Sequence, residues 1–146
     1  MAANAVAPFI LCGRMRPALV PSEGDSDWGH IINVSALEGK FSVGKKSGGH
    51  PHTNMAKAAL NMLTCTSAGG LFAERVLINC VDTGWVTDMA PGGVGAKAAT
   101  HATHVAPPLD ETDGAARVLD PIFSHLNDAS WKIRGKFFKD YRMTQW

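Results

Sequence analysis

Two short apolar runs limit most strongly what this chain can fold into. They cover residues 30–35 and 75–81, are rich in β-branched residues, and are bounded by glycine or by turn residues. Continuous apolar runs of this length favour strands that are buried on both faces, as in a parallel sheet covered by helices. The segments around them have helical spacing, so the order is helix, strand, helix, strand, loop, helix, strand. That alternation predicts an α/β fold.

Helices are expected over residues 2–15, 54–68 and 113–126, and a weak last strand over residues 135–138. Pro8 indicates either a kink in the first helix or a helix that starts near it. Thr53 or Asn54 can cap the second helix, and the pair Gly69 and Gly70 is expected to weaken or end it.

The whole chain, residues 1–146, is expected to form a single domain. That length is small for a complete dinucleotide-binding enzyme. Two firm strands and one weak strand make a poor sheet, and the strand over residues 30–35 would have an unpaired edge. Proteins rarely leave a hydrophobic edge open, so either missing chain or a partner is expected to cover it.

Composition narrows the class of protein. Hydrophobic residues make up 45% and charged residues 18%, and the formal net charge is +1. This balance is that of a globular protein, and nothing favours a nucleic acid or a membrane as partner. Cys12, Cys65 and Cys80 include no CxxC pair and are interpreted as buried free thiols in a reducing compartment. The apolar N-terminus lacks a basic leader, so a cytoplasmic location is expected.

Four segments and the tail together follow the pattern of one enzyme family. NAVAPF at residues 4–9 is similar to the start of that family's central helix, and IINVSALEG at 31–39 to the strand ending in its catalytic serine. TNMAK at 53–57 stands where the family has Tyr-x-x-x-Lys. INCVDTGWVT at 78–87 is similar to the strand and loop that contact the nicotinamide, and GKFFKD at 135–140 to the last strand. In this order and spacing, the chain resembles the C-terminal half of the short-chain dehydrogenase/reductases.

The resemblance implies a partial Rossmann-like fold, a three-layer parallel sheet lacking the N-terminal nucleotide-binding strands. It also implies NAD or NADP as cofactor and a small carbonyl or alcohol as substrate. In the family, tyrosine is the general acid or base, lysine lowers its pKa and holds the nicotinamide ribose, serine polarises the substrate oxygen, and asparagine holds a water. The matching catalytic positions are Lys57, Asn4, Ser35 and Thr53, and the matching cofactor contacts are Lys57, Thr83, Gly84, Trp85, Val86 and Thr87.

The chain departs from the family pattern at its reactive positions. Thr53 stands in place of the tyrosine, and its hydroxyl is far too weak an acid for that role. Ala36 stands where the family's second serine acts. Ser35 is one residue away and points to the other face of the strand unless the strand end twists. No glycine-rich fingerprint follows a strand, and the glycines at residues 92–95 lie too far along the chain to be a good candidate for a phosphate cradle.

Several functional hypotheses remain. The leading one is an NAD(P)-dependent oxidoreductase in truncated or degenerate form, inactive alone and completed by an N-terminal half. The alternative is a non-catalytic assembly or interaction module, because the helices starting near Ala2 and Asn54 correspond to those that pair subunits in the family; a homo-oligomer is then expected. A third is altered acid chemistry using His52 or a water held by Thr53, and His50 is a further candidate acid. His101 and His104 lack a third ligand, so no metal site is predicted.

Overall fold

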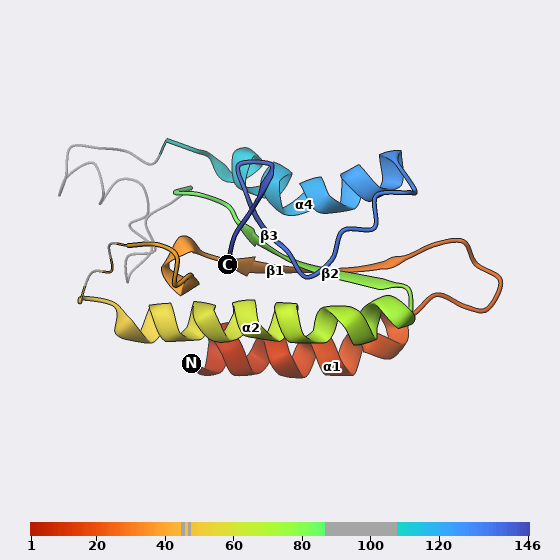
Figure 1. The fold of residues 1–146 in the computed structure, drawn as a ribbon, viewed down its shortest axis with the longest axis horizontal. Helices are drawn as coiled ribbons and strands as arrows, with labels where there is room; N and C mark the ends of the chain where they lie inside the picture. Colours follow the sequence, from red (N-terminus) through yellow and green to blue (C-terminus); the bar gives the residue numbers. More distant parts are fainter. Residues whose placement is uncertain (45, 47, 87–107) are drawn as a thin grey trace.

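The computed structural model describes residues 1–44, 46, 48–86 and 108–146. A four-stranded sheet lies between two long helices on one face and a third helix on the other (Figure 1). The elements, in order, are η1 (Ala2–Val6), α1 (Ala7–Leu19), β1 (Gly29–Ser35), η2 (Leu37–Gly39), α2 (Pro51–Ala73), β2 (Val76–Asp82), α4 (Glu111–Asn127), β3 (Phe137–Lys139) and β4 (Arg142–Thr144). This arrangement confirms the predicted three-layer, Rossmann-like α/β fold.

The sheet has the order β1-β2-β3-β4, and its first three strands are parallel. β1 and β2 pair in register from Gly29 opposite Val76 to Ser35 opposite Asp82. β4, a strand that the sequence did not predict, pairs antiparallel with β3 and adds an antiparallel edge to the parallel sheet. Among the described residues, no strand pairs with the other side of β1, which is the open edge that the sequence predicted.

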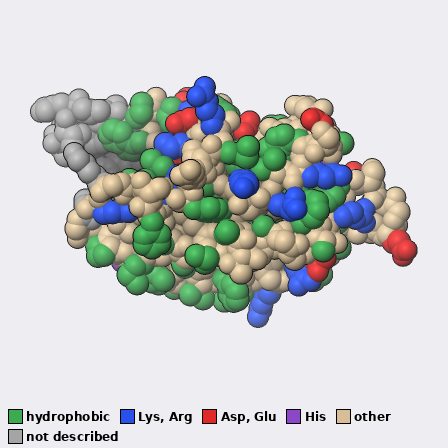
Figure 2. Space-filling view, in the orientation of Figure 1, with side chains coloured by type: hydrophobic (Ala, Val, Ile, Leu, Met, Phe, Trp, Pro, Cys, Tyr) green, Lys and Arg blue, Asp and Glu red, His purple; other side chains and the backbone are tan. Residues whose placement is uncertain are grey.

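The core lies between the sheet and α2. Every residue of β2 is buried, and Val76, Leu77 and Ile78 have no exposed surface. Leu60, which is 3% exposed, comes from the face of α2 that covers the sheet. In contrast, no residue of α1 is buried, although this helix is rich in apolar residues. Hydrophobic side chains gather along the lower margin of the face in Figure 2, over α2 and α1.

The start and the end of α2 both differ from the predicted ones. The helix begins at Pro51 and is preceded by His50, so neither Thr53 nor Asn54 is the capping residue. It also continues through the two glycines to Ala73. Each glycine costs about 1 kcal/mol in a helix interior. Contacts beyond them offset that cost, because the Phe72 ring lies 5.1 Å from that of Trp28. Tertiary packing therefore overrides the local signal.

The two prolines of α1 lie at positions that a helix tolerates to different degrees. α1 begins at Ala7 with Pro8 in its first turn, and the π-helix η1 leads directly into it, so Pro8 lies where the type of helix changes. Pro17 lies inside α1, which ends at Leu19 and so extends past the expected end. Within the described residues, none of the helices is long and apolar enough to span a bilayer.

Candidate functional site

A groove of about 500 Å³ runs along the open side of β1, between this strand and α1. Its walls are mostly apolar, and its polar lining comes from Asn4, Cys12, His30, Asn33 and Lys57. Two of the four predicted catalytic residues, Asn4 and Lys57, therefore line one groove although 53 positions separate them in the sequence. Asn4 belongs to η1 and is exposed, whereas Lys57 belongs to α2 and is partly buried.

Lys57 points from α2 toward the end of the edge strand. Its Nζ donates a hydrogen bond to the backbone oxygen of Val34 at 2.7 Å. Burial lowers the pKa of this lysine, and electrostatic interactions with Cys80, Asp82 and Glu38 oppose that shift. An ammonium group has three donors. Because the described residues accept only one hydrogen bond from it, two donors remain for a ligand in the groove.

Ser35 and Thr53 do not line this groove. Ser35 is buried, with only 5% of the residue exposed. Its hydroxyl donates a hydrogen bond to Oδ1 of Asn61 on α2. It therefore faces the helix, as the alternation of side chains along a strand predicts for the residue before Ala36. Thr53 lies in the first turn of α2, where its backbone N–H donates to the oxygen of His50 at 3.1 Å. His50 and His52 are both exposed.

Asp82, at the carboxyl end of β2, organises the loop that follows. One carboxylate oxygen accepts from the backbone N–H of Gly84 at 2.6 Å and from Lys139 Nζ at 3.3 Å. The other accepts from the backbone N–H of Leu37 at 2.7 Å, which ties the turn after β1 to the end of β2. Asp82 is not among the site residues that the sequence predicted. The available signal was an acidic residue placed directly after a buried strand.

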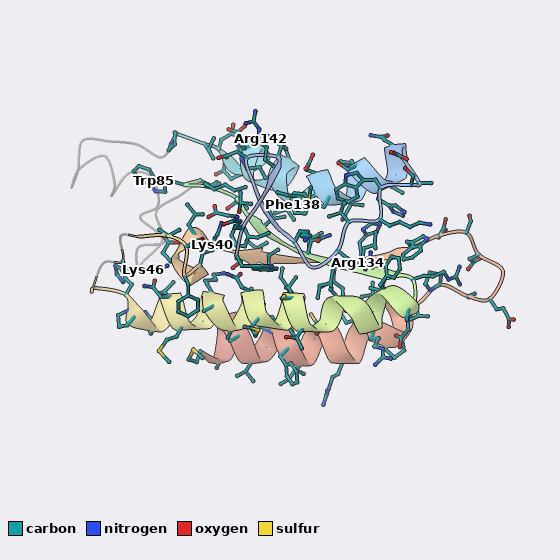
Figure 3. The ribbon with its side chains drawn as sticks, viewed as in Figure 1. Lys40, Lys46, Trp85, Arg134, Phe138 and Arg142 are labelled. Carbon is teal, nitrogen blue, oxygen red and sulfur yellow. The ribbon has the colours of Figure 1, made fainter. Side chains whose placement is uncertain are left out.

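The predicted cofactor contacts follow Asp82 at this same edge of the sheet. Gly84 has a φ of +77°, a conformation that favours glycine. Trp85 is 43% exposed and lies at the end of the molecule where β2 ends (Figure 3). Val86 contacts the start of α4, because a Cβ on Gly114 would lie 3.1 Å from its side chain. Thr83 is partly buried.

Several predictions fall on residues outside the described ones, namely Thr87, the glycines at residues 92–95, His101 and His104. Among the residues that are described, no group of three or more metal-binding side chains occurs.

A line of polar groups that the sequence did not reveal crosses the core behind the groove. Asn33 donates from Nδ2 to Thr64 Oγ1 at 2.8 Å, and Cys80 donates from Sγ to the same oxygen at 3.1 Å. Burial raises the pKa of the Cys80 thiol to about 12, so it stays protonated and unreactive. All three cysteines are free, as predicted, but only Cys80 is buried; Cys12 is partly buried and Cys65 is exposed.

Two histidines connect β1 to α4 on the opposite face of the sheet. His30 Nε2 lies 3.1 Å from His125 Nδ1, so one ring must donate and the other accept. Burial, and then the charge of His125, lowers the pKa of His30. Burial lowers the pKa of His125 as well, aided by Lys132 and opposed by Asp128. The folded protein therefore favours neutral rings, and two protonated rings cannot keep this hydrogen bond.

This pair predicts how stability depends on pH. A histidine with a lowered pKa in the folded state contributes stability that is complete above the ordinary histidine pKa of 6.5 and is lost as pH falls below it. The urea midpoint of unfolding should therefore drop between pH 7.5 and pH 5.5, and His125→Gln should flatten that dependence. His52→Gln, at an exposed ring, serves as the control. An equally steep dependence in His125→Gln and wild type would contradict the assignment.

Comparisons with known proteins give a fold but not a family. No family model matches the chain. An uncharacterized protein of Acanthamoeba polyphaga mimivirus, R665, is 36% identical over 111 residues, which cover 72% of this chain and 23% of the viral protein. The chain therefore spans about a quarter of the length of this curated relative.

Solved structures match nearly the whole chain. The carbonyl reductase Sniffer of D. melanogaster aligns with 98% of this chain and 53% of its own, at a TM-score of 0.68 and 24% identity. The NADPH-bound carbonyl reductase from chicken fatty liver aligns with 98% of this chain and 54% of its own, at a TM-score of 0.65 and 21% identity. The ketoreductase LanV, with bound NADP and rabelomycin, aligns with 95% of this chain and 48% of its own, at a TM-score of 0.61 and 24% identity. The chain thus has the fold of about half of each of these enzymes.

Proposed function

We propose that this chain belongs to the short-chain dehydrogenase/reductases and forms one half of an NAD(P)-dependent oxidoreductase acting on a small carbonyl or alcohol. One combined observation supports the proposal: the chain covers about half of each similar enzyme, and β1 is an edge strand of the sheet. Nearly all of the chain superposes on about half of a carbonyl reductase, and within the described residues its edge strand β1 has a groove beside it instead of a further strand. A second piece of chain that supplies the neighbouring strands would fill that side.

The residues along this edge fit a nicotinamide cofactor. Lys57 has two ammonium donors free of the described residues, and the hydroxyls of a ribose are suitable acceptors. When bound, the cofactor would supply the hydride. Lys57 would hold the ribose, Asn4 would hold a water, and Thr83, Gly84, Trp85 and Val86 would contact the nicotinamide from the end of β2. Thr87 is assigned to the same set by the resemblance alone.

The reactive hydroxyls are the weak part of this site. Thr53 cannot deliver a proton near neutral pH, because an aliphatic hydroxyl is a far weaker acid than a phenol. The hydroxyl of Ser35 already donates a hydrogen bond to Asn61. We therefore expect a complemented protein that binds cofactor but turns over slowly, with an acid other than tyrosine. His52 is exposed at the start of α2 and remains the candidate substitute.

One experiment separates this function from its alternative. NADPH is titrated into the purified chain, alone and after mixing with the N-terminal half of the Drosophila carbonyl reductase, while nicotinamide fluorescence is recorded. We expect no binding at about 1 mM cofactor by the chain alone, and micromolar affinity in the mixture. Failure of the mixture to bind, although a complex forms in sedimentation, would overturn the proposal.

The alternative is a non-catalytic assembly module that pairs copies of the chain. The observation in its favour is the apolar surface of α1, where Phe9 is 64%, Leu11 54% and Met15 53% exposed. Apolar patches of this kind commonly mark interfaces. A stable homodimer that binds no cofactor with or without the added half would support this second function.

A further inference from the structure

A second cavity, of about 200 Å³, lies away from the β1 groove, between η2, α2 and the last residues of the chain. Its lining includes Gly39, Lys40, Phe41, Asn61, Met62 and Trp146. None of Asn4, Lys57 or the residues after β2 lines it. The cavity is therefore separate from the β1 groove, and binding in it does not depend on the proposed cofactor site.

A buried cation borders this cavity. Lys40 is only 6% exposed and lies beside η2, above α2 (Figure 3). Its Nζ donates to Thr144 Oγ1 at 2.6 Å and lies 4.7 Å from the centre of the Phe137 ring. Those contacts use one of three donors. Among the described residues, no carboxylate forms an ion pair with Lys40.

The carboxylate whose charge acts on Lys40, that of Asp82, already accepts hydrogen bonds from other groups. The charge of Asp82 reaches Lys40 and partly offsets the burial that lowers the pKa of this lysine. However, the oxygens of Asp82 accept from Leu37, Gly84 and Lys139. Burying a charge without a paired counterion is costly, so buried charges in proteins are generally paired. Within the part of the chain that the structure describes, Lys40 thus lacks the counterion that its burial calls for.

The other walls of the cavity indicate what kind of anion would fit. Asn61 has a buried Nδ2 with no hydrogen-bond partner among the described residues, which is a second unused donor. Phe41 and Met62 are 93% and 64% exposed, so large apolar surfaces flank the polar groups. The Trp146 ring, packed edge-on against Phe137 at 5.9 Å, closes one side. Such walls fit a compact ligand with an anionic end and an apolar body.

We propose that this cavity binds a small organic carboxylate, whose charged group meets Lys40 and whose apolar part lies against Phe41, Met62 and Trp146. The carboxylate would supply the counterion that Lys40 lacks and acceptors for unused donors. Charge-assisted hydrogen bonds of this kind are roughly twice as strong as neutral ones. The charge therefore distinguishes the ligand from neutral molecules of the same shape.

Benzoate and its neutral counterpart benzamide test the proposal on the full chain, by titration followed in ¹H–¹⁵N NMR spectra. We expect benzoate to bind at least about tenfold more tightly than benzamide and to shift the Asn61 side-chain amide and the Trp146 indole signals. Equal affinities, shifts elsewhere only, or no binding of benzoate at about 10 mM would overturn the proposal, and these results need no variant.

Lys40→Met tests the assignment directly. Benzoate affinity should fall by about tenfold or more, because the charge is removed while most of the side-chain volume stays. Lys136→Met, the same change at an exposed lysine, should leave the affinity unchanged. Thermal unfolding followed by circular dichroism shows whether Lys40→Met is folded. Unchanged benzoate affinity in a folded Lys40→Met would contradict the proposal; if this variant does not fold, the comparison with benzamide in the wild type decides.

Discussion

Lys57→Met is expected to lower the NADPH affinity of the complemented protein by about a hundredfold, the largest functional effect that we anticipate. The substitution removes a positive charge and the two ammonium donors that are not engaged with Val34. A ribose contact would be lost while the side chain keeps nearly its full length. Stability should change little, because Lys57 is only partly buried and its side chain makes a single hydrogen bond to the described residues.

The measurement is fluorescence titration of the nicotinamide in the mixture with the N-terminal half. Lys136→Met is the matched control, because it removes an exposed lysine whose side chain contacts no group in the groove. A Lys57→Met protein with wild-type cofactor affinity would show that the resemblance of TNMAK to the family motif does not extend to cofactor binding.

Gly39→Ala is expected to destabilise the fold by about 3 kcal/mol, the largest effect on stability that we predict for a single added methyl group. A Cβ at this buried position would lie 2.6 Å from the backbone carbon of Lys57 and 2.8 Å from the backbone nitrogen of Ala58. Neither atom belongs to a flexible side chain, so η2 and α2 would have to separate. That separation would also move the backbone that carries Lys57.

Urea unfolding followed by circular dichroism measures this effect. Gly13→Ala is the control, because a Cβ at Gly13 meets nothing within 4 Å and the residue lies inside α1. Alanine is the better helix former there, so Gly13→Ala should stabilise the protein by up to about 1 kcal/mol. A Gly39→Ala protein as stable as the wild type would mean that η2 and α2 are not packed as closely as the structure places them.

The sequence predicted the central strands well and the outer one not at all. Continuous apolar runs predict β1 and β2. The observed bounds differ from the predicted ones by one residue, except at the end of β1, where the two agree. β4 has three residues, two of them exposed, so no apolar pattern in the sequence predicts this strand. It forms because Asp140 and Tyr141 adopt φ values of +48° and +63°, which turn the chain back on β3.

The candidate site was predictable only in part. Resemblance to a family placed Asn4 and Lys57 in one set, and the structure brings both to the same groove. Their roles toward a cofactor stay predictions. The core contacts of Asn33 with Thr64 had no signal in the sequence, because a polar residue in an apolar run does not say which distant residue completes its hydrogen bonds.

The sequence by itself determined which segments form the central strands, and it predicted that the side chains of Ser35 and Ala36 point to opposite faces. Both results follow from local backbone geometry, in which side chains alternate along a strand and apolar runs are buried. Only the tertiary structure decided that α2 continues past its glycines, that Ser35 meets Asn61, and that Lys40 is buried beside Thr144. Those outcomes depend on which groups come together when elements distant in the chain pack, and no local pattern contains that information.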